Sequence, residues 1–182
     1  MPTLRISKEN EDALYFVTFT ALEWINIFTS KEYFNCIIKC LKFCQKELGL
    51  LLYEYVIMTN HIHLIIQAKE GYQASKIISS FKKFTTKEIL ELLRNDRRKY
   101  ILRLLENSFA TKNQNQLQVW QETNYPEIIE SEKFLQQKVS YIHNNPVIKG
   151  YTDEPQNWVY SSAKNRYLDD NAIIQLDDLI YQ

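Results

Sequence analysis

The chain has 182 residues, a length typical of one domain with a sizeable buried core. Hydrophobic residues make up 45% of it and charged residues 24%, as in ordinary globular proteins. It has no apolar run of about eighteen residues and no apolar signal core near its start, so we expect a cytoplasmic protein without a membrane span. The formal net charge is zero, which by itself argues against a nucleic-acid partner.

The distribution of charge argues the other way. Positions 76–103 contain nine Lys and Arg residues against three acidic ones. A cluster of this kind suits a groove for nucleic-acid phosphates, and it equally suits a solvated helix face, so the charge pattern alone leaves both open. The candidate DNA contacts within it are Lys82, Lys83, Lys87, Arg94, Arg97, Arg98 and Lys99.

Strand and helix patterns alternate along the chain. Runs of β-branched and aromatic residues predict strands over residues 14–20, 51–58 and 61–67, and over 119–121 and 127–130 around Pro126. Apolar residues at helical spacing predict helices over residues 31–48, from residue 73 onward, over 132–145 up to Pro146, and over 158–167. The polar and basic stretch 95–118 predicts an excursion or mobile loop.

This order of elements predicts one α+β domain, with its core at about residues 14–168 of 1–182. The expected architecture is a ferredoxin-like antiparallel sheet with helices on one face, plus a C-terminal tyrosine-bearing helix.

The three histidines of the chain lie in two short motifs. Met-Thr-Asn-His-Ile-His-Leu occupies positions 58–64, and Tyr-Ile-His-Asn-Asn-Pro occupies 141–146. Strand alternation puts His61 and His63 on one face, opposite the apolar side chains, and we expect that face to be open to substrate. Two imidazoles at this spacing can share a divalent ion, although a pair of surface histidines has the same pattern.

Tyr141 and Asn145 are four residues apart, so a helix places them on the same face. Asn145 then offers a carbonyl oxygen as a third metal ligand, and Tyr141 becomes a candidate nucleophile for a phosphodiester. A phenol with a pKa of about 10 needs activation, which a divalent ion can provide. Imidazole and oxygen ligands with open positions suit Mg²⁺ or Mn²⁺. The alternative is that Tyr141 packs on the sheet. For His143 we expect helix-end packing or a DNA contact.

Together the motifs resemble the HUH (His-hydrophobe-His) single-strand DNA transposases with one catalytic tyrosine, the IS200-like transposases. The resemblance covers most of the chain, and the Tyr-x-x-x-Asn-Pro form is most similar to the branch associated with REP palindromes. This sequence has Thr59 where the family usually has proline, which predicts a slightly looser turn. Trp-Val-Tyr-Ser-Ser at 158–162 also departs from the usual Trp-Ser-Ser.

The resemblance implies a metal-dependent enzyme that binds DNA hairpins and cuts and rejoins single strands beside them. Tyr141 would form a 5′-phosphotyrosine and free a 3′-OH, with His61, His63 and Asn145 holding the metal. The implied partner is single-stranded DNA with a REP-like hairpin, and both monomer and homodimer stay open. The main alternative is a module that binds structured single strands without cutting them. A small-ligand domain would leave the basic segment unexplained.

Overall fold

The computed structural model of the chain describes residues 6–111, 117–122, 125–168 and 173–179. Its strands are β1 (Tyr15–Thr20), β2 (Leu50–Ile57), β3 (His61–Ala68) and β4 (Glu127–Ile128). Its α-helices are α1 (Lys31–Glu47), α2 (Ala74–Asn95), α3 (Lys99–Thr111), α4 (Glu132–Ile148) and α5 (Ala163–Leu168). Short 3₁₀ helices cover Lys8–Asn10, Leu22–Trp24 and Pro155–Asn157.

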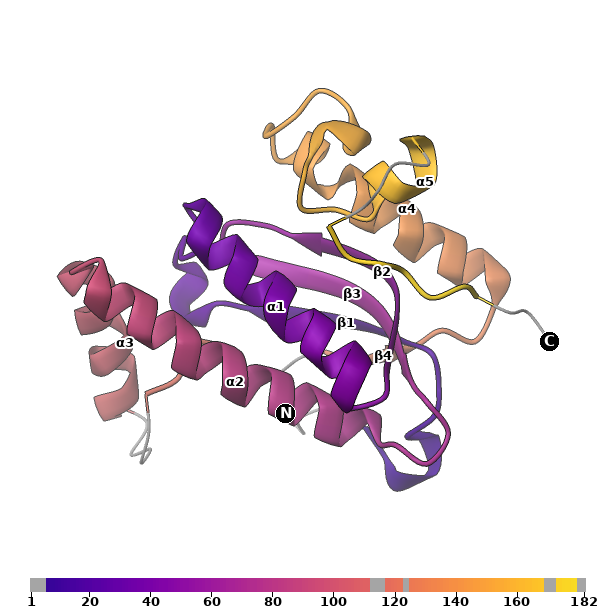
Figure 1. Cartoon of the computed structure of the whole chain (residues 1–182), viewed down its shortest axis with the longest axis horizontal. Coiled ribbons are helices and arrows are strands. Elements are labelled where there is room, and N and C mark those ends of the chain that lie inside the picture. Colours follow the sequence, from indigo (N-terminus) through magenta and orange to yellow (C-terminus); the bar gives the residue numbers. More distant parts are fainter. Residues whose placement is uncertain (1–5, 112–116, 123–124, 169–172, 180–182) are drawn as a thin grey trace.

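The strands that the structure describes form one antiparallel sheet in the order β2-β3-β1-β4 (Figure 1). β3 pairs with β2 on one side and with β1 on the other, so it is a central strand. A short turn at Thr59-Asn60 joins β2 to β3, as the hairpin pattern predicts. Both the strand order and the succession of elements are those of a ferredoxin-like fold, which confirms the predicted fold class.

α1 and α2 pack side by side on one face of the sheet (Figure 1). The main core lies between them and the sheet, where Val17, Ile62 and Leu64 meet Ile37 and Phe81. The helices present these side chains at helical spacing and the strands at a period of two, which is why the sequence predicts both. Within the described residues, no helix is both long enough and apolar enough to cross a membrane.

The opposite face of the sheet is covered by α4, which Figure 1 shows lying across the far side from α1 and α2. A second apolar cluster forms there, in which Leu135 and Ile142 of α4 meet Phe16 and Ile65 of the strands. The histidine face is therefore mostly covered and not open as expected, and a ligand can reach it through pockets that the two histidines line. The same helix that carries Tyr141 packs against that face, because its own apolar stripe must also be buried.

Three local expectations need correction. The stretch 95–118 is not the loop that the sequence predicts. Most of it is α3 (Lys99–Thr111), which buries Ile101 and Leu105, one turn apart, in the main core. α4 continues past Pro146 to Ile148, because a proline near the end of a helix removes only one hydrogen bond of the last turns. The last helix begins at Ala163 and not at Trp158, since residues 158–162 run along β2, where Ser161 bridges to Val56.

Candidate active site

His61 and His63 point to the same face of β3, as strand alternation predicts. Their ring centroids lie 4.8 Å apart. Because α4 crosses this face, the two residues are only 6% and 5% exposed. His63 nevertheless lines a pocket of about 580 Å³, and His61 lines a smaller one of about 110 Å³. Both rings thus border space that a ligand can enter.

Burial keeps both imidazoles neutral. Loss of hydration on burial lowers the pKa of His61 to about 4, and it lowers the pKa of His63 to about 3, where the neighbouring His61 also contributes. A neutral imidazole has a lone pair, which a metal ligand needs and a protonated ring lacks. At neutral pH both side chains are therefore in the form that can bind a cation.

The hydrogen bonds of His61 assign its tautomer. The Asn60 amide nitrogen donates to the Trp24 carbonyl at 3.2 Å, which turns the Asn60 amide oxygen toward His61 Nδ1 at 2.7 Å. That oxygen can only accept, so Nδ1 carries the hydrogen and Nε2 presents the lone pair. Across from Nε2, at 3.3 Å, lies the Asn145 side-chain oxygen. Two acceptor atoms that face each other at this distance fit a shared cation.

His63 completes the arrangement. Its Nδ1 lies 2.8 Å from the Thr18 hydroxyl on the neighbouring strand, while its Nε2 is buried without a hydrogen-bond partner. An unsatisfied buried nitrogen is rare and calls for a missing ligand or ion. The described residues contain no cluster of three or more His, Cys, Asp and Glu side chains. The candidate donor set is His61, His63 and the Asn145 amide oxygen, and its chemistry fits a divalent cation with open positions for substrate.

Tyr141 lies beside this donor set, within the same chain. Its ring is 5.0 Å from the His63 ring and 6.1 Å from the Phe16 ring, both in edge-on contact. Unlike the histidines it is 45% exposed, and it lines the larger pocket together with His63. Helix α4 brings Tyr141 and Asn145 to the site together, as their four-residue spacing predicts. The Tyr141 ring is thus held by aromatic contacts while it remains accessible from the pocket.

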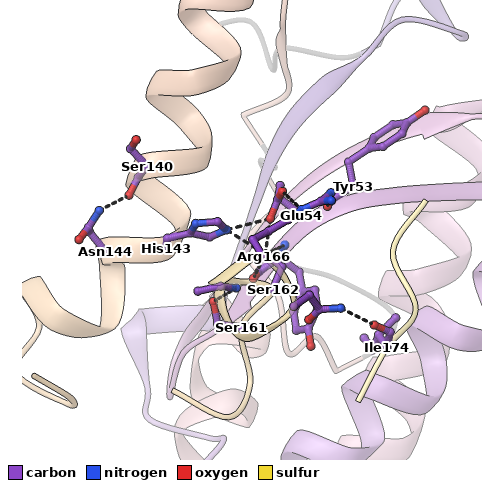
Figure 2. A network of polar contacts seen from close by, with 12 residues as sticks. Tyr53, Glu54, Ser140, His143, Asn144, Ser161, Ser162, Arg166 and Ile174 are labelled. Carbon is purple, nitrogen blue, oxygen red and sulfur yellow. Dashed lines mark hydrogen bonds and ion pairs between the residues drawn. The ribbon is translucent and has the colours of Figure 1, made fainter. Parts of the chain in front are cut away.

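A buried polar network that the sequence motifs do not reveal anchors α4 to the sheet (Figure 2). Glu54 of β2 receives hydrogen bonds from His143 Nε2 at 2.8 Å, from the Ser162 hydroxyl at 2.5 Å and from Arg166 Nε at 2.8 Å. Burial by itself would raise the pKa of Glu54, but the hydrogen bonds and charges of these partners hold that pKa below its usual value. His143 therefore packs in the interior and does not face DNA.

A β-bulge aims Glu54 at this network. Leu52 pairs with Ile66 and Glu54 with Ile65, so Tyr53 is the extra residue. The bulge changes the phase of β2, because Leu52 faces the main core whereas Glu54 faces α4. Strict alternation from Leu52 would have placed Glu54 under α1 and α2. His143 lies between Tyr141 and Asn145 in the sequence of α4, so the network holds the segment of the helix that carries both site residues.

The basic residues of the predicted DNA surface lie elsewhere. They lie on α2, in the turn after it and at the start of α3. α2 packs on the face of the sheet opposite the histidine pair. Two have structural contacts: Lys82 donates to the Gln121 carbonyl at 2.7 Å, and Arg98 donates to the Ile27 carbonyl at 3.0 Å. Burial lowers the pKa of the Lys82 amine to about 8. The exposed members are Lys83, Lys87, Arg94, Arg97 and Lys99.

The lowered histidine pKa values predict an acid-sensitive fold. In the unfolded chain both imidazoles take up protons below about pH 6.5, whereas in the folded chain they do so only near pH 4 and 3. Protons therefore favour the unfolded state as the pH falls between these limits. From pH 7 to pH 5 we expect each histidine to reduce the free energy of unfolding by about 2 kcal/mol.

Urea denaturation at both pH values, with a chelator present, measures this effect. His63→Gln removes one titrating group and should show the smaller loss, which separates the histidine contribution from that of other groups. Equal pH dependence in the two proteins would contradict the assigned burial of His63.

The general class of this protein is defined by three features. These are a ferredoxin-like sheet, a His-x-His pair on its central strand, and one tyrosine on the helix that covers that strand. The sequence model of the family described as "Transposase IS200 like" matches residues 15–145. The chain belongs to the IS200-like transposase family.

Two further comparisons describe what the chain is similar to. A protein of Haemophilus influenzae described as uncharacterized is 31% identical over 102 residues, an alignment that spans 52% of this chain and 53% of that protein. The chain thus aligns with only about half the length of that relative. The solved structure of a REP-associated tyrosine transposase bound to a REP hairpin superposes with a TM-score of 0.62 at 17% identity, over 100% of this chain and 95% of that chain. This likeness confirms the fold.

Proposed function

We propose that the protein cleaves and rejoins single-stranded DNA beside a hairpin, with Tyr141 as nucleophile. The observation that carries the proposal is the position of Tyr141, which is accessible from the pocket and 5.0 Å, ring to ring, from a histidine with an orphaned nitrogen. A tyrosine that only packed on the sheet would not need these neighbours. The solved neighbour that holds a REP hairpin supports the same class of substrate.

In the proposed reaction the Tyr141 oxygen attacks the scissile phosphorus. The bond from phosphorus to the 3′ oxygen breaks, the phenolic proton is lost, and the leaving oxygen takes up a proton as a free 3′-OH. The 5′ end remains attached to Tyr141 as a phosphotyrosine, and a later attack by a 3′-OH on that bond rejoins strands. His61, His63 and Asn145 would hold Mg²⁺ or Mn²⁺, which when bound polarises the phosphate. The aromatic contacts of Tyr141 limit the positions that its hydroxyl can adopt.

Incubation of the protein with hairpin-bearing single strands and Mn²⁺ tests the proposal, with a covalent protein–DNA adduct as the expected result. Retained hairpin binding without any adduct would instead favour the alternative function, a module that binds structured single strands. A second arm with a chelator in place of Mn²⁺ tests the metal requirement, because the adduct should then be absent.

The exposed basic residues of α2 are expected to contact the DNA backbone away from the reacting phosphate. We expect the combined change of Lys83, Lys87 and Arg94 to alanine to weaken binding to all hairpin strands. It should also reduce the slope of log affinity against log salt by about 0.9 for each duplex phosphate that the variant no longer neutralises. Filter binding over a range of salt concentrations measures both quantities.

A matched control for this change is available on α1. Lys39, Lys42 and Lys46 are also exposed, and their combined change to alanine removes the same charge. If the α1 variant weakens binding as much as the α2 variant, the effect reflects net charge and the α2 cluster is only a solvated face.

A further inference from the structure

Two exposed aromatic side chains form part of the wall of the pocket beside Tyr141. Trp24, which follows β1, is 59% exposed, and Tyr125, which precedes β4, is 54% exposed. Trp24 also borders the smaller pocket next to His61, at a ring distance of 6.0 Å from that histidine. Large apolar rings exposed at a pocket are candidates for ligand contact, since burying them against a flat partner removes apolar surface from water.

Both aromatic residues have an unfavourable backbone conformation. Trp24 has a φ of 55° and Tyr125 a φ of 42°, in the left-handed region that residues with large side chains rarely adopt. Tyr125 also precedes Pro126, a position that normally favours extended backbone. A conformation of this kind is costly and persists only where the surroundings impose it.

The surroundings of Trp24 connect it to the metal-binding residues. Its backbone nitrogen donates to the Ala21 carbonyl at 3.0 Å, and its carbonyl accepts the hydrogen bond from Asn60. The same Asn60 side chain contacts His61 Nδ1. One amide therefore contacts both a proposed metal ligand and the backbone of the residue that carries the exposed indole. This shared support is expected if the two side chains act on neighbouring groups of one substrate.

We propose that this pocket binds a base of the DNA strand next to the scissile phosphate, with Trp24 and Tyr125 as stacking surfaces. The proposal rests on the proposed function for the identity of the strand. A pocket of about 580 Å³ is large enough for one nucleotide. Aromatic rings stack on any base, while the side-chain amides of Gln121 and Gln137, which line the same pocket, can bind base edges. The class of ligand is a nucleobase in an unpaired strand.

The fluorescence of Trp24 provides a direct test. Of the three tryptophans, Trp24 is exposed and lines the pocket, whereas Trp120 is buried and Trp158 is partly buried and does not line it. With a chelator present to prevent cleavage, an oligothymidylate strand should quench the emission. An abasic strand of the same length has the phosphates without the bases and should not. Trp24→Phe should abolish the quenching and keep the affinity.

Trp24→Ala should reduce the affinity for oligothymidylate by about tenfold, since stacking contributes roughly 1–3 kcal/mol per base. Its affinity for the abasic strand should not change. Tyr100→Ala, at an exposed aromatic residue on α3, is the matched control and should leave both affinities unchanged. Equal quenching by both strands, or equal reductions of affinity in the Trp24 and Tyr100 variants, would overturn the base site. None of these measurements involves strand cleavage. Absence of a covalent adduct would therefore reject the proposed nuclease function and leave the base site standing.

Discussion

Replacement of Tyr141 by phenylalanine is expected to abolish the covalent protein–DNA adduct and leave hairpin binding intact. The change removes one oxygen and keeps the ring, so the edge-on contacts with Phe16 and His63 remain. We expect adduct formation to fall by more than about 1,000-fold, because loss of a nucleophile removes the reaction path and does not merely slow it. Denaturing gel electrophoresis of protein with labelled strands measures the adduct, and filter binding measures the affinity.

Tyr151→Phe is the matched control. Tyr151 has the same 45% exposure as Tyr141 and lines the smaller pocket on the other side of the histidine pair. Its hydroxyl contacts Thr59, so the control also removes a hydroxyl that is close to the site. Adduct formation should survive in this variant. An adduct that persists in Tyr141→Phe and disappears in Tyr151→Phe would move the nucleophile to Tyr151.

Asn145→Ala should behave differently from both tyrosine variants. It removes the amide oxygen that faces His61 Nε2 and leaves the nucleophile in place. Adduct should still form, but only at a higher Mn²⁺ concentration, because two imidazoles alone hold the ion less firmly. A comparison of the Mn²⁺ dependence therefore separates the ligand role of α4 from its nucleophile role.

The parts of the site that the sequence predicts are those set by local periodicity. A period of two places His61 and His63 together on β3, and a spacing of four places Tyr141 and Asn145 together on α4. Both relations hold within single elements, so no knowledge of packing is needed. That these two pairs meet in space follows from the family resemblance, and the contact between His61 and Asn145 agrees with it.

The parts that the sequence does not predict depend on contacts between elements. The bulge at Tyr53 reverses the face of Glu54, and no residue pattern in β2 marks it. Burial of the histidines depends on α4 covering the sheet, a tertiary contact that strand alternation does not include. α3 is not predicted because the polar and basic residues on either side of it dominate the stretch 95–118, although Ile101 and Leu105 within it are spaced for burial.

Replacement of Glu54 by alanine is expected to destabilise the protein strongly. The variant removes the shared acceptor of His143, Ser162 and Arg166, and leaves a cavity at a buried position. Ser162 and Arg166 each keep a hydrogen bond to a β2 carbonyl, so the main loss falls on His143 and on the pair between Arg166 and Glu54. Breaking a fully buried ion pair from one side costs about 3–5 kcal/mol, and because Arg166 is 38% exposed and partly screened by solvent, we expect a loss at the lower end, about 3 kcal/mol. Glu54→Gln keeps the shape and one acceptor oxygen, so we expect a smaller loss, on the order of 1–3 kcal/mol. Denaturant unfolding followed by circular dichroism measures both values.

Glu47→Ala separates this effect from the loss of any carboxylate. Glu47 forms an exposed ion pair with Lys46 at 3.3 Å, and such pairs contribute only about 0–1 kcal/mol. Because the network holds α4 between Tyr141 and Asn145, Glu54→Gln should also slow adduct formation at temperatures where the variant is fully folded. The Mn²⁺ concentration that it requires should rise as well, since Asn145 moves with the same helix. If Glu54→Ala unfolds at the denaturant midpoint of Glu47→Ala, the network does not anchor α4, and the position of Tyr141 must then depend on its aromatic contacts alone.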